Sequence, residues 1–208
     1  KALFALLAVT TVGPVLAADT LPVTLPTRQD NRLEQVTTSP RVWNGITVSQ
    51  DNRLFASLTQ SEGSGLQLAE VLDGKLKAYP DASWNQWQSE DPEHHFYHVN
   101  ALRIGPDGDL WVMDAGNKGI GTGDQAVPGG AKLVRINLAS GKVVGSYVFK
   151  APTLKATSYL DDVRFNGDFA YLTDPGAVGL VILNLKTGKS WRALDNHELS
   201  IDHLPIYA

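Results

Sequence analysis

One unit of sequence occurs three times in this chain, and it constrains the fold more than any other feature. Residues 99–114 hold two apolar segments joined by Pro106-Asp107-Gly108. Proline fixes φ and glycine tolerates positive φ, so this unit predicts two antiparallel strands with a tight turn. Residues 43–57 and 160–174 repeat the layout. The aligned positions are Asn44, Asn100 and Asp161, then Ile46, Leu102 and Val163, and then Phe55, Trp111 and Tyr171.

Each copy is followed by two further apolar segments, so each repeat has the four strands of a propeller blade. We predict an all-β fold, a β-propeller of four-stranded blades, with about three blades in this chain. Three blades cannot close a ring, and an open stack exposes apolar faces and sheet edges at both ends. The expectation is therefore that the chain is a fragment, about the first half of a larger propeller, unless two copies pair.

Composition agrees with a folded all-β protein. The 208 residues are 43% hydrophobic and 19% charged, with 19 glycines and 11 prolines spread between short apolar segments. A net charge of −4 gives no support for nucleic-acid binding, which needs a clustered basic surface. The absence of cysteine excludes disulfides and thiolate metal sites but does not fix the compartment.

The first residues have the layout of an export signal. A lysine precedes an apolar segment that ends in Val15-Leu-Ala17, so we predict a signal peptide over residues 1–17. A buried helix is the alternative. Residues 18–40 are polar and punctuated by proline, which predicts an extended segment, and residues 41–208 form the partial propeller. We expect a secreted or periplasmic protein that is not inserted in the membrane after cleavage.

Several blocks, in this order, resemble the major royal jelly protein/Yellow family: Val42–Val48, Tyr79–Asn85, Leu110–Gly116, Lys132–Leu138, Phe169–Gly176 and Gly179–Arg192. The resemblance implies a secreted six-bladed β-propeller, of which this chain is about the N-terminal half. The chain lacks the cysteines that insect members use, which indicates a bacterial-type member.

The polar residue that opens each innermost strand is the best candidate for chemistry. Innermost strands of a propeller start around one end of the central channel, so Asn44, Asn100 and Asp161 would point oxygen atoms at the axis. Such oxygens suit a hard cation, and we expect Ca²⁺. The layout is also similar to that of calcium-dependent gluconolactonase-like propellers, which implies that Asp161 is the catalytic acid. The alternative is that all three side chains satisfy turn backbone groups.

Two further residues are predicted to contact a ligand. His98 lies two residues before Asn100, at the expected channel mouth, and Trp84 belongs to an aromatic loop. Pinning that loop to the core is the alternative role for Trp84. A zinc site that includes His94 and His98 is a weaker alternative, because the segment has the composition of a loop. Asp114 and Asp174, which close second strands, are expected to accept hydrogen bonds from turn amides.

These observations predict a secreted propeller that binds a small molecule in its central channel. The first alternative is a calcium-dependent lactone hydrolase that uses the same channel. The second alternative is a propeller that binds other proteins through its loops. The sequence leaves open whether the chain is an enzyme; if it is one, a metal-dependent lactonase-type hydrolase is expected.

Overall fold

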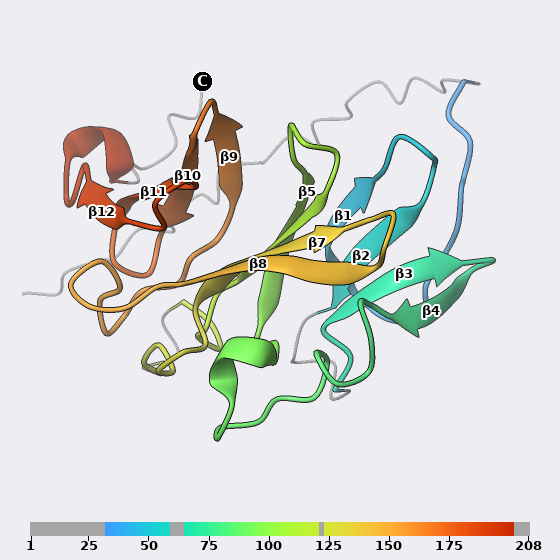
Figure 1. Cartoon of the computed structure of the whole chain (residues 1–208), viewed down its shortest axis with the longest axis horizontal. Helices are drawn as coiled ribbons and strands as arrows, with labels where there is room; N and C mark the ends of the chain where they lie inside the picture. The colour runs from blue at the N-terminus through green and yellow to red at the C-terminus, as the bar shows by residue number, and fades with distance from the viewer. Residues whose placement is uncertain (1–31, 59–64, 121–122, 202–208) are drawn as a thin grey trace, which may run out of the picture. The chain divides into compact units, whose positions relative to one another are not determined.

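The computed structural model describes residues 32–58, 65–120 and 123–201 (Figure 1). By its internal contacts the chain divides into two units, Lys1–Val36 and Thr37–Ala208, and every strand described below belongs to the second. The predicted signal peptide and most of the extended segment after it lie outside the described residues. In the described part of the chain, no helix is long and apolar enough to span a membrane.

Three four-stranded sheets make up the second unit (Figure 1). In each sheet the strands are ordered as in the chain and neighbours run antiparallel, so the predicted all-β architecture of four-stranded blades is confirmed. Short 3₁₀ turns occupy η2 (Pro92–His94) and η3 (Glu198–Ser200). The first blade holds β1 (Trp43–Val48), β2 (Leu54–Leu58), β3 (Leu68–Leu72) and β4 (Lys75–Ala78); the second holds β5 (Val99–Ile104), β6 (Leu110–Asp114), β7 (Lys132–Asn137) and β8 (Lys142–Val148); the third holds β9 (Val163–Asn166), β10 (Phe169–Asp174), β11 (Gly179–Asn184) and β12 (Ser190–Ala193).

The second blade is buried on both faces, because it packs against a blade on each side. Every residue of β6 is buried, as its continuous apolar sequence predicts. Leu110 and Val112 join the core shared with the first blade, whereas Trp111 and Met113 join the core shared with the third. The alternation of side chains along one strand therefore divides it between two cores.

The repeat position of Trp111 has the same role in the first blade. Phe55 is fully buried in the core between the first and second blades, and Trp111 is 2% exposed in the core between the second and third. Trp111 also packs on Phe165 of the third blade, with 5.0 Å between ring centroids. The first and second blades thus each insert one aromatic side chain toward the next blade along the chain.

Irregular pairing marks the start of two innermost strands. The register of β1 against β2 shifts between Trp43 and Ile46, and that of β5 against β6 shifts between Val99 and Ala101. A bulge inserts an extra residue and re-aims the side chains beside it. The shifted segments contain the repeat asparagines, so the irregularity lies where the candidate site was predicted.

Gly45 allows the first two blades to approach closely at this point. Its N–H donates to Ser57 Oγ at 2.7 Å, and that hydroxyl donates to the carbonyl oxygen of Asn100 at 3.0 Å. A Cβ on Gly45 would lie 2.9 Å from Ser57 Oγ and 3.0 Å from the Asn100 carbonyl oxygen. A larger residue at this position would therefore push the blades apart.

A buried carboxylate holds the segment that leads into β5. Asp114 accepts hydrogen bonds from the backbone N–H of Tyr97 at 2.7 Å and of His98 at 2.9 Å. It also accepts from the turn N–H of Gly116 at 3.1 Å, as predicted. Lys132 Nζ lies 2.8 Å from the same carboxylate, and both side chains are fully buried.

The third blade has an equivalent buried carboxylate, Asp174. Asp174 accepts from the backbone N–H of Tyr159 at 2.9 Å and from the turn N–H of Ala177 at 3.1 Å. Arg192 replaces lysine as the cation, with its Nη1 2.7 Å from the carboxylate. In the first blade, Asn85 Oδ1 instead accepts from two backbone N–H groups where β3 begins. Buried acceptors therefore position the strands in all three blades.

We expect Asp114→Asn to lower the free energy of unfolding by about 3–5 kcal/mol, because Lys132 would be left buried without a counter-charge. Chemical denaturation measures the change. Adding Lys132→Met should recover part of the loss, since no buried charge then remains unpaired. Asp168→Asn is the matched control: its ion pair with Lys186 is exposed, so the change should be within about 1 kcal/mol. Equal effects of the two single substitutions would contradict this account.

Candidate functional site

The three repeat residues meet, although they are far apart in sequence. Asn44 Nδ2 donates to the carbonyl oxygen of Asn100 at 2.9 Å and also to Asn100 Oδ1. Asn100 Nδ2 in turn donates to the carbonyl oxygen of Asp161 at 3.1 Å and to its carboxylate. The result is a head-to-tail hydrogen-bond chain that crosses the three blades. We call these three residues the polar centre.

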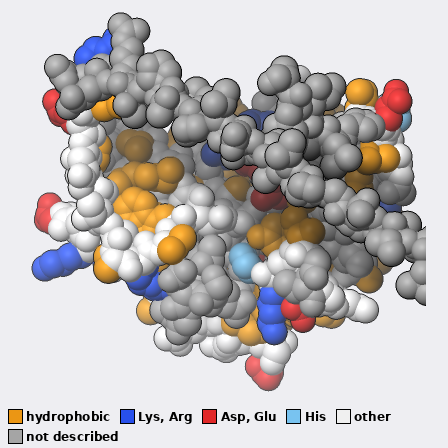
Figure 2. All heavy atoms as spheres, turned by 180° about the vertical axis from the view of Figure 1, so that it is seen from behind, with side chains coloured by type: hydrophobic (Ala, Val, Ile, Leu, Met, Phe, Trp, Pro, Cys, Tyr) orange, Lys and Arg blue, Asp and Glu red, His pale blue; other side chains and the backbone are white. Residues whose placement is uncertain are grey.

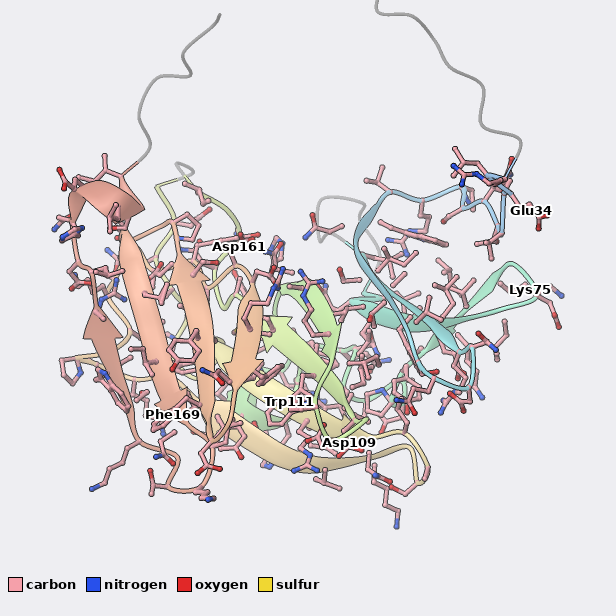
Figure 3. All side chains as sticks on the ribbon, turned by 90° about the horizontal axis from the view of Figure 1, so that it is seen from above. Glu34, Lys75, Asp109, Trp111, Asp161 and Phe169 are labelled. Carbon is pink, nitrogen blue, oxygen red and sulfur yellow. The ribbon has the colours of Figure 1, made fainter. Side chains whose placement is uncertain are left out.

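The third member is placed differently from the other two. Asn44 and Asn100 are the second residues of β1 and β5, whereas Asp161 precedes β9 by two residues. Its backbone is fixed by an N–H that donates to Thr173 O at 2.9 Å. Figure 3 shows Asp161 at one end of the third blade, with Phe169 toward the opposite end.

A cavity of about 350 Å³ opens beside the polar centre. Its wall combines amide and carboxylate groups with short apolar side chains, and one arginine stands at its edge. The lining residues are Asn44, Gly45, Ile46, Asn100, Ala101, Leu102, Arg103, Asp161 and Asp162.

Hydrogen bonding leaves two acceptor oxygens of the polar centre unused. Asn100 Oδ1 already accepts from Asn44 Nδ2 and from the hydroxyl of Tyr159 at 3.0 Å. No described residue donates to Asn44 Oδ1 or to Asp161 Oδ2. Among the described residues, no lysine, arginine or histidine lies within ion-pair distance of Asp161. This carboxylate therefore lines a cavity without a counter-charge from the described chain.

The neighbouring carboxylate is in a different environment. Asp162 accepts from Arg103 Nη2 at 2.5 Å and from Arg164 Nη1 at 2.6 Å. Burial alone would raise the pKa of Asp162, but hydrogen bonds from Arg103, its own Val163 N–H and Arg164 together lower it. Of the two adjacent aspartates, only Asp161 is free to bind a ligand cation or donor.

His98 and Tyr159 lie directly behind the polar centre. Their rings meet edge to face, with centroids 5.8 Å apart. His98 is 6% exposed, and its Nδ1 is buried with no hydrogen-bond partner among the described residues. Burial lowers the pKa of His98, and the charge of Asp114 opposes this only in part. The imidazole is therefore neutral at pH 7.

Tyr159 is the contact that sequence reasoning missed. It lies two residues before Asp161, as His98 lies two residues before Asn100, so the two occupy the same repeat position. That alignment could have indicated that their side chains approach each other across the blade boundary. Burial raises the pKa of Tyr159 to about 12, and the charges of Asp161 and Asp114 add to the effect. The phenol therefore remains a donor to Asn100 at neutral pH.

Trp84 lies away from the polar centre. It does not line the cavity, and its ring packs 5.0 Å from that of Phe96 at the core between the first and second blades. His94 and His95 bind neighbouring loop groups, Asp91 Oδ1 and the Ser83 carbonyl oxygen, each at 2.7 Å. Within the described ranges, no group of three or more His, Cys, Asp or Glu side chains could hold a metal ion.

Residues 99–205, about half of the chain, match the family model described as major royal jelly protein. No curated protein sequence matches the chain.

Solved structures with a similar course of the chain have low sequence identity. A protein described as the extracellular domain of a one-component system from B. thetaiotaomicron is 15% identical over 71% of this chain, with a TM-score of 0.47. An auxiliary nutrient binding protein from Bacteroides ovatus is 11% identical over 74%, also with a TM-score of 0.47. An inactive virginiamycin B lyase from Staphylococcus aureus, solved with quinupristin, is 19% identical over 72%, with a TM-score of 0.35. The matches span 16%, 32% and 54% of those proteins.

Raising the pH should destabilise the chain partly through Tyr159. Its phenol has a pKa of about 12 when folded and about 10 when unfolded, so the folded state binds this proton more tightly. The stabilisation is complete below pH 10 and is lost as the pH rises through 12, a loss on the order of 2 kcal/mol. Urea unfolding between about pH 9 and 12 measures it.

Tyr159→Phe should remove this component of the pH dependence. Tyr79 and Tyr97, whose pKa values burial also raises, are present in both proteins and so cancel in the comparison. Identical pH profiles for the two proteins would show that Tyr159 is not buried as described.

Proposed function

Because this chain belongs to the major royal jelly protein family, we propose that it binds a small polar molecule at the polar centre. The observation that carries the proposal is the pair of unused acceptor oxygens, Asn44 Oδ1 and Asp161 Oδ2, on residues that line one cavity. Asn44 is exposed and Asp161 is half-buried, so both oxygens are within reach of a ligand that brings O–H or N–H donors.

The rest of the cavity suits a compact ligand. Ile46, Ala101 and Leu102 supply apolar wall, and about 350 Å³ is at the small end of ligand sites. Tyr159 fixes the amide of Asn100, so that its Nδ2 is directed at Asp161 rather than at the ligand. In this proposal Asn44 and Asp161 bind the ligand, while Asn100 and Tyr159 hold them in place.

We also propose that the site works outside the cytoplasm. The support is the apolar segment and the small-residue ending within residues 1–17, which have the layout of an export signal.

Calcium-dependent lactone hydrolysis is the second candidate, and the uncompensated charge of Asp161 is the observation that favours it. The described residues do not complete a calcium site. Ca²⁺ takes six to eight oxygen ligands, and only Asn44 and Asp161 keep unused side-chain oxygens, since that of Asn100 already accepts two hydrogen bonds. This candidate therefore needs ligands beyond those of the polar centre.

Side-chain amide resonances can test the proposed binding site. We expect a binding ligand, found by titrating a panel of sugars, hydroxy acids and lactones into ¹⁵N-labelled protein, to shift the NH₂ signals of Asn44 and Asn100. Asp161→Asn should weaken binding at least about tenfold, because one acceptor site becomes a donor. Asp168→Asn, the same change at an exposed ion pair, is the control and should leave affinity unchanged. Shifts confined to residues outside the cavity would contradict the proposal.

Calorimetric titration with Ca²⁺ alone separates the two candidates. Saturable heat that Asp161→Asn abolishes and Asp168→Asn leaves intact would favour the metal-dependent enzyme. Lactone hydrolysis that depends on added Ca²⁺ would then be required as well. Without such heat, ligand binding is the function that the site supports.

A further inference from the structure

The cavity beside the polar centre has a basic group in its wall as well as acidic ones. Arg103 lines it together with Asp161 and Asp162. The guanidinium of Arg103 donates from Nη2 to Asp162 Oδ2 at 2.5 Å and from Nη1 to the Leu102 carbonyl oxygen at 3.2 Å. Arg164 Nη1 lies 2.6 Å from the same oxygen of Asp162. Two cations therefore share one carboxylate.

This shared ion pair leaves one positive charge in excess. Among the described residues, neither arginine has a second carboxylate within ion-pair distance. Arg164 is exposed and does not line the cavity, so water and salt screen its charge, whereas Arg103 is half-buried in the cavity wall. Two of the five N–H groups of Arg103 are used, and its buried Nε has no partner in the described part of the chain. One N–H on each terminal nitrogen of Arg103 is therefore available to a further acceptor.

The same cavity also carries a negative charge. The carboxylate of Asp161 has no basic partner among the described residues, and none of them donates to its Oδ2. Asn44 Oδ1 is a second acceptor that the described chain leaves unused. In the coloured part of the surface in Figure 2, acidic and basic side chains are scattered rather than gathered by sign. The charges of the cavity are therefore local, and they come from Asp161 and Arg103.

We propose, on the basis of the function proposed above, that the ligand of this cavity is a zwitterion with one ammonium group and one carboxylate, as in an amino acid. Its ammonium donates to Asp161 Oδ2 and Asn44 Oδ1. Its carboxylate accepts from the terminal nitrogens of Arg103. Hydrogen bonds between charged groups are the stronger ones, so each end of the ligand is bound by a fixed group of opposite charge.

Repulsion makes the cavity selective against molecules that carry only one of these charges. A simple amine pairs with Asp161, but its charge is repelled by Arg103. A simple carboxylate pairs with Arg103, but its charge is repelled by Asp161. Specificity arises from unfavourable contacts with the wrong ligand as well as from favourable contacts with the right one. A zwitterion matches both charges and adds no net charge to the cavity.

Calorimetric titration of the full chain with a matched series of small molecules tests the proposal. The series is glycine, β-alanine, γ-aminobutyrate and ε-aminocaproate, in which the ammonium and the carboxylate lie progressively further apart. Butylamine and butyrate are the singly charged counterparts. We expect at least one zwitterion to bind about tenfold more tightly than both counterparts. The preferred member measures the spacing of the two charged groups. If no zwitterion in the series binds more tightly than butylamine, the proposal is wrong.

Arg103→Gln and Arg164→Gln form a matched pair of variants. Each removes one of the two cations that bind Asp162 and leaves the other, but only Arg103 lines the cavity. We expect Arg103→Gln to weaken binding of the preferred zwitterion about tenfold without weakening that of butylamine, and Arg164→Gln to change neither. Equal effects of the two variants would overturn the proposal. Circular dichroism checks folding. If Arg103→Gln is unfolded, Arg103→Lys, which keeps the charge but loses the planar fork, should still weaken zwitterion binding selectively.

The side-chain NH₂ resonances of Asn44 and Asn100 separate failure of this proposal from failure of the proposed function. If an uncharged ligand shifts them and Asp161→Asn weakens its binding, but a carboxylate on the ligand adds nothing, the polar centre binds ligands and only the class of ligand is wrong. If neither this series nor the panel of sugars, hydroxy acids and lactones shifts them, both proposals are wrong.

Discussion

The arrangement depends on a buried carboxylate at the end of the second strand of a blade. Asp114 and Asp174 each bind backbone N–H groups of the segment that enters the innermost strand, and each is neutralised by a buried cation from its own blade. The residues so held lie two or three positions before Asn100 and Asp161. The polar centre is therefore positioned by ionic contacts within each blade rather than by the blade-to-blade cores alone.

Within this framework, the polar centre uses its amides to join blades, and its unused side-chain oxygens belong to the residues at its two ends. Asn100 is fully engaged, with two donors on its oxygen and its own Nδ2 directed at Asp161. Asn100 therefore connects the blades, although it occupies the same repeat position as Asn44 and Asp161. The unused oxygens belong to Asn44 and Asp161, at the two ends of this series of hydrogen bonds. Only Asp161 also carries a negative charge, and for this reason it is the centre of the proposal.

Much of this could be predicted from the sequence, because the repeat is strong and local. Alternating apolar residues and turn-forming residues, such as Pro106-Asp107-Gly108, specify the hairpins. Alignment of the three copies predicted that Asn44, Asn100 and Asp161 lie near one another. The bulges at Asn44 and Asn100 could not be predicted, since they arise from the approach of one blade to the next. Trp84 packs on Phe96 at the core, which is the alternative role that its place in an aromatic loop left open. Whether the three predicted ligands bind Ca²⁺ stays a prediction.

The two asparagines carry an amide where Asp161 carries a carboxylate, and this difference gives the series of hydrogen bonds a direction. An amide both donates and accepts, so an asparagine can accept a hydrogen bond from one blade and donate one to the next. A carboxylate only accepts, so the repeat that carries Asp161 terminates the series. Among the described residues, the hydrogen bonds therefore run in one direction, from Asn44 through Asn100 to Asp161.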